Sequence, residues 1–213
     1  MAKGGGSHPL PSGRLEVTLI DWGKHRILHR VHSSKFEPDQ FNPSSMGDAR
    51  FSPLVANDGG VVATLYAGTT LDCALMETVF HDVPYAPGLK TLSKSSHITG
   101  RVRSTIRSPR DLRLIDLSAI PLRKLGVSRS SLIDTDASEY PLTRQWALAF
   151  HEQNPEVEGL IWTSRQADPE RAIVLFADRL GTLLFEKVDP PESLILPDGS
   201  APSSNQSLTG VSK

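Results

Sequence analysis

Alternating apolar and polar positions predict two strands and a helix in the first part of the chain. The segments "RILHRVH" (26–32) and "GVVATLYAG" (60–68) carry the β-branched and aromatic residues typical of strands. The next segment, "TTLDCALMETVFHDV" (69–83), begins with a threonine that can cap a helix. Its mostly apolar positions fall near one helical face: Leu71, Ala74, Leu75, Thr78 and Val79.

The second part of the chain predicts more strands than helices. "SSHITGRVRSTI" (95–106) and "DLRLIDLS" (111–118) have strand patterns, and "TRQWALAFHEQN" (143–154) predicts a helix that Pro155 ends. "VEGLIWTS" (157–164) and "RAIVLFAD" (171–178) predict a hairpin joined by the polar turn "RQADPE". This mixed order favours an α+β sandwich over a doubly wound sheet.

Length and composition indicate one domain with irregular ends. A chain of 213 residues leaves little room for two domains. We expect a flexible N-terminus over residues 1–13, a folded domain over 14–190, and a disordered tail over 191–213, because both ends have little apolar surface to bury. No apolar stretch approaches the length of a membrane span, and the N-terminus lacks a secretory signal, so we expect a cytoplasmic protein.

Charge and cysteine content narrow the function classes. The formal charge of -1 offers no net field for a nucleic acid. The arginines of "RVRSTIRSPRDLR" (101–113) could bind an anion, but a solvated strand face and turn is the favoured interpretation. Cys73 predicts a buried small residue rather than a nucleophile. A strand would place His25 and His29 on one face and His32 on the other, so no metal site is expected.

Three polar side chains stand out within residues 47–78, where apolar neighbours predominate. Glu77 lies on a largely apolar helix, where an unpaired charge is costly, although an exposed helix face would also explain it. Tyr66 ends an apolar strand, and such rings also occur at the core or rim of a fold. Arg50 lies in a turn-rich segment where it could simply be solvated. None of these signals is specific alone, so the residues alone leave open whether the three side chains are satisfied core residues or the walls of a pocket.

The same stretch resembles the RES-domain family, named for an arginine, a glutamate and a serine. The matching motifs are the turn "GDARF", the strand "TLYAG" and the helix "ALMET", with Arg50, Tyr66 and Glu77 at their polar positions. The earlier "HRVH" resembles the family's opening arginine strand and assigns Arg30. "GLIWTSRQADPERAIVLFAD" resembles its closing segment and assigns Ser164. The resemblance covers residues 26 to 180.

The resemblance implies an α+β fold similar to that of ADP-ribosyltransferases, a mixed β-sandwich with flanking helices. It also implies an enzyme that uses NAD+ as its substrate, without a metal, as the toxin of a toxin–antitoxin pair. Its partner would be a cognate antitoxin, of the Xre-like kind, in a hetero-oligomer, with no direct contact to nucleic acid or membrane.

Each residue of the set suits that chemistry. Glu77 can oppose the positive charge that develops on the ribose. Arg30 and Arg50 suit the pyrophosphate, Tyr66 can stack on the cationic nicotinamide, and the Ser164 hydroxyl can hold the carboxamide or a ribose hydroxyl.

Several reactions and one non-catalytic role remain open on the sequence. Hydrolysis and phosphorolysis of NAD+ and ADP-ribosyl transfer to a protein share the breaking of the nicotinamide–ribose bond and differ in the acceptor. The strand-end position of Ser164 also fits a purely structural cap. A binding module without catalysis would use the arginines to hold a nucleotide or an acidic partner.

Overall fold

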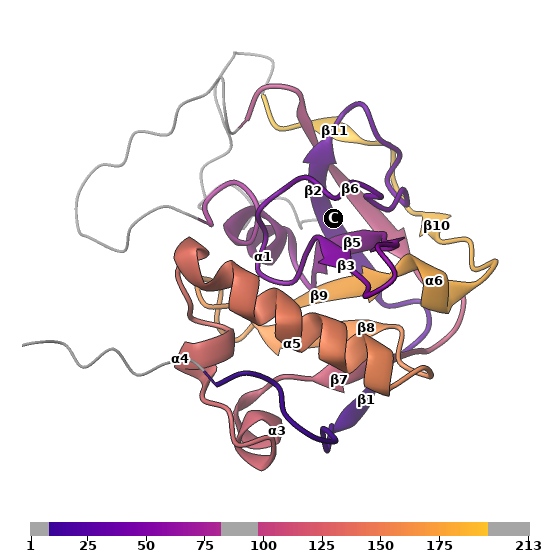
Figure 1. Cartoon of the computed structure of the whole chain (residues 1–213). Coiled ribbons are helices and arrows are strands. Elements are labelled where there is room, and N and C mark those ends of the chain that lie inside the picture. The colour runs from indigo at the N-terminus through magenta and orange to yellow at the C-terminus, as the bar shows by residue number, and fades with distance from the viewer. Residues whose placement is uncertain (1–8, 82–97, 196–213) are drawn as a thin grey trace, which may run out of the picture.

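A computed structural model describes residues 9–81 and 98–195 of the chain (Figure 1). Most of the described strands belong to one large mixed sheet, and β3 (Leu54–Val55) and β4 (Val61–Val62) form a separate two-stranded sheet. In the large sheet the spatial order is β1 (Leu19–Trp22), β7 (Leu112–Asp116), β8 (Gly159–Thr163), β9 (Arg171–Phe176), β5 (Thr64–Gly68), β2 (Ile27–Ser33), β6 (Arg101–Arg107) and β10 (Glu186–Lys187), with β11 (Glu192–Ser193) also paired to β6.

The large sheet consists of two parts that are joined at one place. β2 pairs with β6 over seven register positions but with β5 only where His29 faces Gly68. Figure 1 shows β2 and β6 crossing the direction of β9. A buried cluster that includes Leu28 and Ile106 from one part, and Leu65 and Leu175 from the other, packs between them. This sandwich-like arrangement confirms the predicted α+β class.

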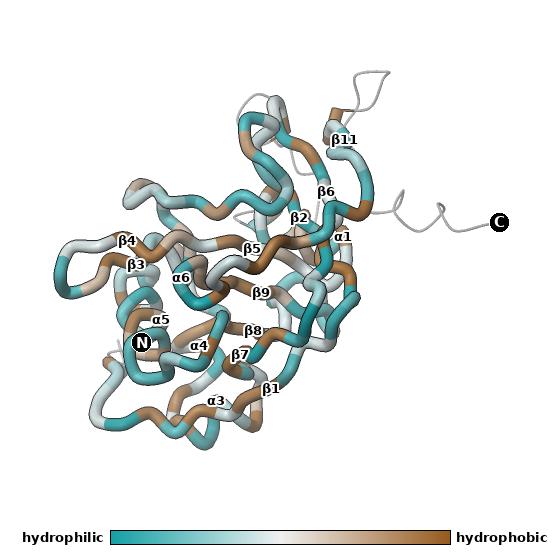
Figure 2. Tube along the Cα trace, turned by 90° about the vertical axis from the view of Figure 1, so that its right-hand side faces the viewer, coloured by the Kyte–Doolittle hydropathy of each residue, from teal (hydrophilic) through white to brown (hydrophobic). Residues whose placement is uncertain are grey.

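The long helix α5 (Tyr140–Gln153) packs against the strands of the larger part. Trp146, Ala147 and Phe150 share a buried cluster with sheet residues such as Leu160 and Val174. Figure 2 shows hydrophobic residues concentrated along β8 and β9. The helix predicted over 143–154 is present, but it begins three residues earlier, at Tyr140, and ends at Gln153, before Pro155. The remaining helical elements are short: α1 (Leu71–Met76), α3 (Ala119–Lys124), α4 (Arg129–Leu132), the 3-10 helix η1 (Ala137–Glu139) and α6 (Ala177–Leu180).

Helix α1 is shorter than the sequence predicts. Thr70 caps it by accepting a hydrogen bond from the Cys73 backbone N–H at 3.2 Å. The helix ends at Met76, because the next turns tighten around the Leu75 carbonyl, which accepts three backbone N–H groups. It also packs closely on the end of β5, where a Cβ on Gly68 would lie 2.7 Å from the Ala74 nitrogen. Residues 82–83 of the predicted helix lie outside the described residues.

Some strand predictions are confirmed and others are wrong in their bounds. The strand predicted over 60–68 is divided into β4 and β5, which lie in different sheets. The strand predicted over 95–106 begins at Arg101, after a turn at 98–100, and residues 95–97 lie outside the described residues. β8 and β9 form the predicted antiparallel hairpin. The strand predicted from residue 26 begins at Ile27, and His25 lies in the preceding turn with a φ of 64°. His25 therefore does not share a strand face with His29. Among the described residues, no cluster of three possible metal-ligating side chains is present.

Residues before position 14 and after position 190, outside the domain expected from the sequence, also contact the folded domain. The backbone carbonyl of Pro9 accepts a hydrogen bond from the Trp146 indole at 2.8 Å. At the other end β11 pairs with β6, and Leu194 is 2% exposed. The limits at residues 14 and 190 stay a prediction, and residues 1–8 and 196–213 lie outside the described residues. Within the described ranges, no helix is long and apolar enough to cross a membrane.

Candidate active site

A cavity of about 410 Å³ lies between β2, β5, the start of β6, the end of α1 and the 48–52 turn. Four of the residues predicted from the sequence line it: Arg30, Arg50, Tyr66 and Glu77. These residues come from segments up to 47 positions apart in the chain, so the fold brings them together. Ser164 is not among the residues that line the cavity.

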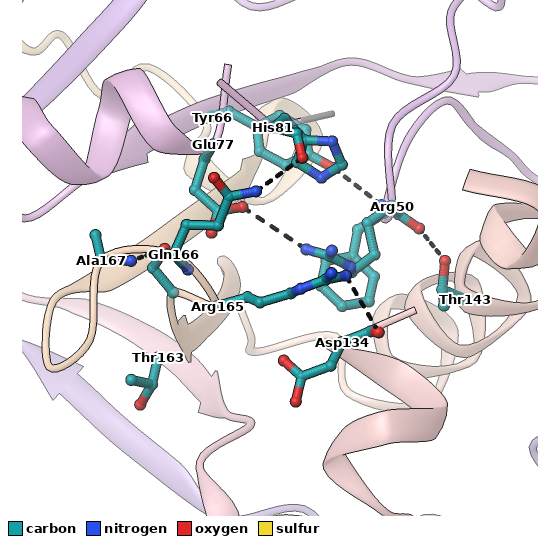
Figure 3. A network of polar contacts seen from close by, with 12 residues as sticks. Arg50, Tyr66, Glu77, His81, Asp134, Thr143, Thr163, Arg165, Gln166 and Ala167 are labelled. Carbon is teal, nitrogen blue, oxygen red and sulfur yellow. Dashed lines mark hydrogen bonds and ion pairs between the residues drawn. The ribbon is translucent and has the colours of Figure 1, made fainter. Parts of the chain in front are cut away.

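Arg50, which is buried, and Glu77, which is mostly buried, form an ion pair on the cavity wall (Figure 3). The Arg50 Nη1 atom lies 3.7 Å from the Glu77 Oε2 atom, and the two side chains are 4% and 11% exposed. Charges removed from water interact more strongly than charges on a surface. Arg50 Nε is also buried and has no hydrogen-bond partner among the described residues. The site therefore holds a spare buried donor next to its carboxylate.

The peptide group that joins Arg50 to Phe51 is fixed by two distant side chains. The Thr143 hydroxyl donates a hydrogen bond to the Arg50 carbonyl. The Tyr66 hydroxyl accepts a hydrogen bond from the Phe51 backbone N–H at 3.0 Å. These contacts tie the 48–52 turn to α5 and to β5. The position of the Arg50 guanidinium thus depends on contacts outside its own segment.

Tyr66 is held at its ring as well as at its hydroxyl. The ring packs edge-on against Trp162, with centroids 6.2 Å apart. Burial raises the pKa of Tyr66 to about 12. The side chain is therefore neutral at ordinary pH, and besides lining the cavity it positions the turn that carries Arg50.

Arg30 directs much of its guanidinium toward backbone carbonyls. Its Nε donates to Tyr66 O at 3.2 Å, its Nη2 donates to Gln40 O at 3.3 Å, and its Nη1 donates to Pro38 O. Burial lowers the pKa of Arg30 to about 10, so the side chain keeps its charge at neutral pH. Arg30 thereby anchors the 38–40 segment to β5, while it also contributes to the cavity wall.

Ser164 caps a turn behind the site. It is fully buried, and its hydroxyl accepts hydrogen bonds from the backbone N–H groups of Gln166 and Ala167 at 3.3 and 3.2 Å. It also lies beside Cys73, whose pKa burial raises to about 12. These contacts fit the strand-end cap that the sequence left open, and a contact between Ser164 and substrate stays a prediction. The Gln166 side chain donates to the His81 carbonyl at 2.9 Å, which connects this turn to the cavity wall.

Three residues that the sequence analysis did not select complete the surroundings. His81 and Arg101 line the cavity, and the Tyr140 hydroxyl lies 2.8 Å from the His81 Nε2 atom. The Arg50 guanidinium lies 5.7 Å from the centroid of the Tyr140 ring. His81 lies four residues after Glu77, but the helix ends before both residues, so helical spacing does not explain why they meet. No sequence signal placed Tyr140 near either residue.

This geometry defines a class of site. An α+β fold presents a polar cavity in which three arginines and a histidine face two carboxylates, those of Asp48 and Glu77. Arginine suits phosphate groups, and a buried carboxylate suits hydroxyls or a developing positive charge. The site therefore has the composition expected for a small ligand that carries both phosphate and sugar groups.

Comparison with known families agrees with the sequence motifs. The model of the RES domain family matches residues 25–196, and the chain belongs to this family. No curated protein matches the chain. A solved structure with the same fold is a chain of the crystal structure of the M. tuberculosis MbcT–MbcA toxin–antitoxin complex. The two chains are 13% identical with a TM-score of 0.56, and the match covers 83% of this chain and 86% of the other.

Proposed function

We propose that the protein is the toxin of a toxin–antitoxin pair and that it cleaves the nicotinamide–ribose bond of NAD+. The observation that carries the proposal is the Arg50–Glu77 pair, buried on the wall of a cavity in a RES-domain fold. The fold shared with a chain of a toxin–antitoxin complex supports the toxin role. NAD+ enters the proposal as a substrate.

Glu77 would supply the main electrostatic contribution to bond cleavage. When the C–N bond breaks, its electron pair moves to the nicotinamide nitrogen, which becomes neutral, and positive charge develops on the ribose. The buried Glu77 carboxylate can oppose that charge without the reorganisation that water requires. Arg50, 3.7 Å away, holds the carboxylate in place.

The acceptor of the ribosyl group sets the overall reaction. Water or phosphate would attack the ribose C1 atom and lose a proton, giving hydrolysis or phosphorolysis. A side chain of another protein at the same position would give ADP-ribosylation. The first half of the reaction is common to all three, so the same cavity residues serve each of them.

An enzyme that consumes NAD+ in the cell that makes it needs an inhibitor. The M. tuberculosis structure with the same fold is a complex with an antitoxin, which supports a cognate antitoxin for this chain. We propose that this partner, of the Xre-like kind, covers the cavity or its entrance. The two proteins would form a hetero-oligomer in the cytoplasm.

The test is to incubate the protein with NAD+, with and without phosphate, and to identify the products by mass spectrometry. Wild type should release nicotinamide, and Glu77→Gln should lower the rate by about 100-fold or more, the scale for removing one preorganised electrostatic group. Glu156→Gln is the control, because Glu156 is exposed and does not line the cavity. It should retain full activity.

Expression in cells tests the toxin role separately. Wild type alone should stop growth and lower cellular NAD+, whereas Glu77→Gln should do neither at equal levels of soluble protein. No nicotinamide release with water, phosphate or a protein acceptor would overturn the enzymatic proposal. Tight NAD+ binding without turnover would make the chain a binding module instead.

A further inference from the structure

We infer that Arg101 is the residue that binds a phosphate group of the ligand in this cavity. The inference rests on the proposed function, because it assigns the anion subsite of the same site. Arg101 begins β6, is partly buried and lines the cavity together with Arg30, Arg50 and Glu77.

The three cavity arginines differ in what already occupies them. Arg30 donates to three backbone carbonyls, and Arg50 pairs with Glu77. Arg101 makes no side-chain hydrogen bond or ion pair with any residue in the ranges 9–81 and 98–195. As far as the described residues go, its guanidinium therefore retains its full donor set for a ligand.

Charge in the cavity also points to an anion. Glu77 is paired with Arg50, and Asp48 is paired with Arg144 at 2.9 Å. The two carboxylates of the cavity are thus compensated, whereas the positive charge of Arg101 has no acidic partner among the described residues. An anionic ligand would supply the missing negative charge, and the planar guanidinium can bind a phosphate through two parallel hydrogen bonds.

The backbone of Arg101 is fixed although its side chain is free. Its N–H donates to the Ile98 carbonyl, and its own carbonyl accepts from the Leu194 N–H, both at 3.1 Å. Neighbouring arginines lack this combination. Arg103 and Arg107, on the same strand, are paired with Glu192 and Glu186 at 2.5 Å. Arg103 and Arg107 thus fit the solvated arginine face expected from the sequence, whereas Arg101 lines the cavity.

The phosphate group has two possible sources in the proposed reaction. It can belong to the pyrophosphate of NAD+, or it can be the inorganic phosphate that accepts the ribosyl group. Both present the same oxygens to Arg101. The two sources differ in which constant rises when the Arg101 guanidinium is removed: the KM for NAD+ or the KM for phosphate.

The experiment compares wild type, Arg101→Gln and the matched control Arg103→Gln. Dissociation constants for ADP-ribose are measured by calorimetry, and KM values for NAD+ and for phosphate are measured from nicotinamide release. Loss of a charge-assisted hydrogen bond predicts an increase of about 10- to 100-fold in the constant that reports the bound phosphate. Arg103→Gln should stay within twofold of wild type, because Arg103 faces Glu192.

The pattern of changes in these constants shows which phosphate group Arg101 binds and whether it binds one at all. A rise in the ADP-ribose and NAD+ constants identifies the pyrophosphate, and a rise in the phosphate constant alone identifies the co-substrate. Values for Arg101→Gln within twofold of wild type in every arm would overturn the inference. If wild type binds ADP-ribose but releases no nicotinamide, the enzymatic proposal fails, and the binding data alone judge Arg101. Absence of both binding and turnover would refute both.

Discussion

Replacing Tyr66 with phenylalanine isolates the hydroxyl that positions the Arg50 turn. The ring and its packing on Trp162 are retained, so the change removes the hydroxyl alone, which accepts from the Phe51 N–H and also contacts the Ser52 side chain. Phe51 is 0% exposed, and its N–H would lose its partner in the protein interior. An unsatisfied buried donor costs about 1–3 kcal/mol. In a domain of this size each kcal/mol lowers Tm by about 2–4 °C.

The pH dependence of stability gives a second measure of the same substitution. Burial raises the folded-state pKa of Tyr66 to about 12, above its ordinary value of 10.0. The stability from the neutral hydroxyl is therefore fully present below pH 10 and is lost as pH rises toward 12, since the unfolded chain releases the proton first. That loss is on the order of 2 kcal/mol, because partial exposure through the cavity screens some of the shift.

Urea unfolding at pH 7 and at several values above pH 9 measures both effects. Tyr66→Phe should be about 1–3 kcal/mol less stable at pH 7. The difference from wild type should shrink as pH rises above 10, because the wild type alone loses the Tyr66 contribution. A difference below 0.5 kcal/mol at pH 7, or one that is constant with pH, would refute this account of the hydroxyl.

Two further substitutions test the site and the helix that carries it. Arg50→Lys should raise the KM for NAD+ well beyond twofold in a folded protein. A lysine ammonium lacks the planar fork with which a guanidinium can contact Glu77 and a phosphate oxygen at the same time. Kinetic constants within twofold of wild type would leave Arg50 a purely structural role. Gly68→Ala should destabilise the fold by about 1–3 kcal/mol in urea unfolding. The added Cβ atom would lie 2.7 Å from the Ala74 nitrogen and 2.9 Å from the Cys73 Cβ. Unchanged stability would mean that α1 can move away from β5 at no cost.

Elements with a long buried face were predictable from the sequence. β8 and β9 were recognised because every residue from Leu160 to Trp162 and from Ala172 to Phe176 is buried, which produces continuous apolar runs. The two-residue strands β3, β10 and β11 carry no such pattern, since their pairing depends on neighbouring strands. The early end of α1 was not predictable for a similar reason. Its final turns tighten to bury Val79 beside Ala74 and Leu75.

The candidate site was predictable where one segment carries it. Arg50, Tyr66 and Glu77 lie within 28 residues, in motifs whose order could be matched to a family. Arg101 and Tyr140 reach the site through tertiary structure, so periodicity contains no signal for them. The family motif identified Ser164 in the sequence but did not predict what its side chain contacts. Those contacts are made by the turn that follows β8.

The cavity residues depend on one another through backbone contacts more than through direct side-chain pairs. Arg30 holds the Tyr66 carbonyl, Tyr66 holds the Phe51 N–H, and Thr143 holds the Arg50 carbonyl. Weakening one contact therefore allows the next to move, and the only direct charge pair in this chain of contacts is Arg50 with Glu77. Substitutions at residues that share such a network are not additive. The combined loss from changing Arg30 and Tyr66 should thus fall short of the sum of the single losses, because both act on the position of the same arginine.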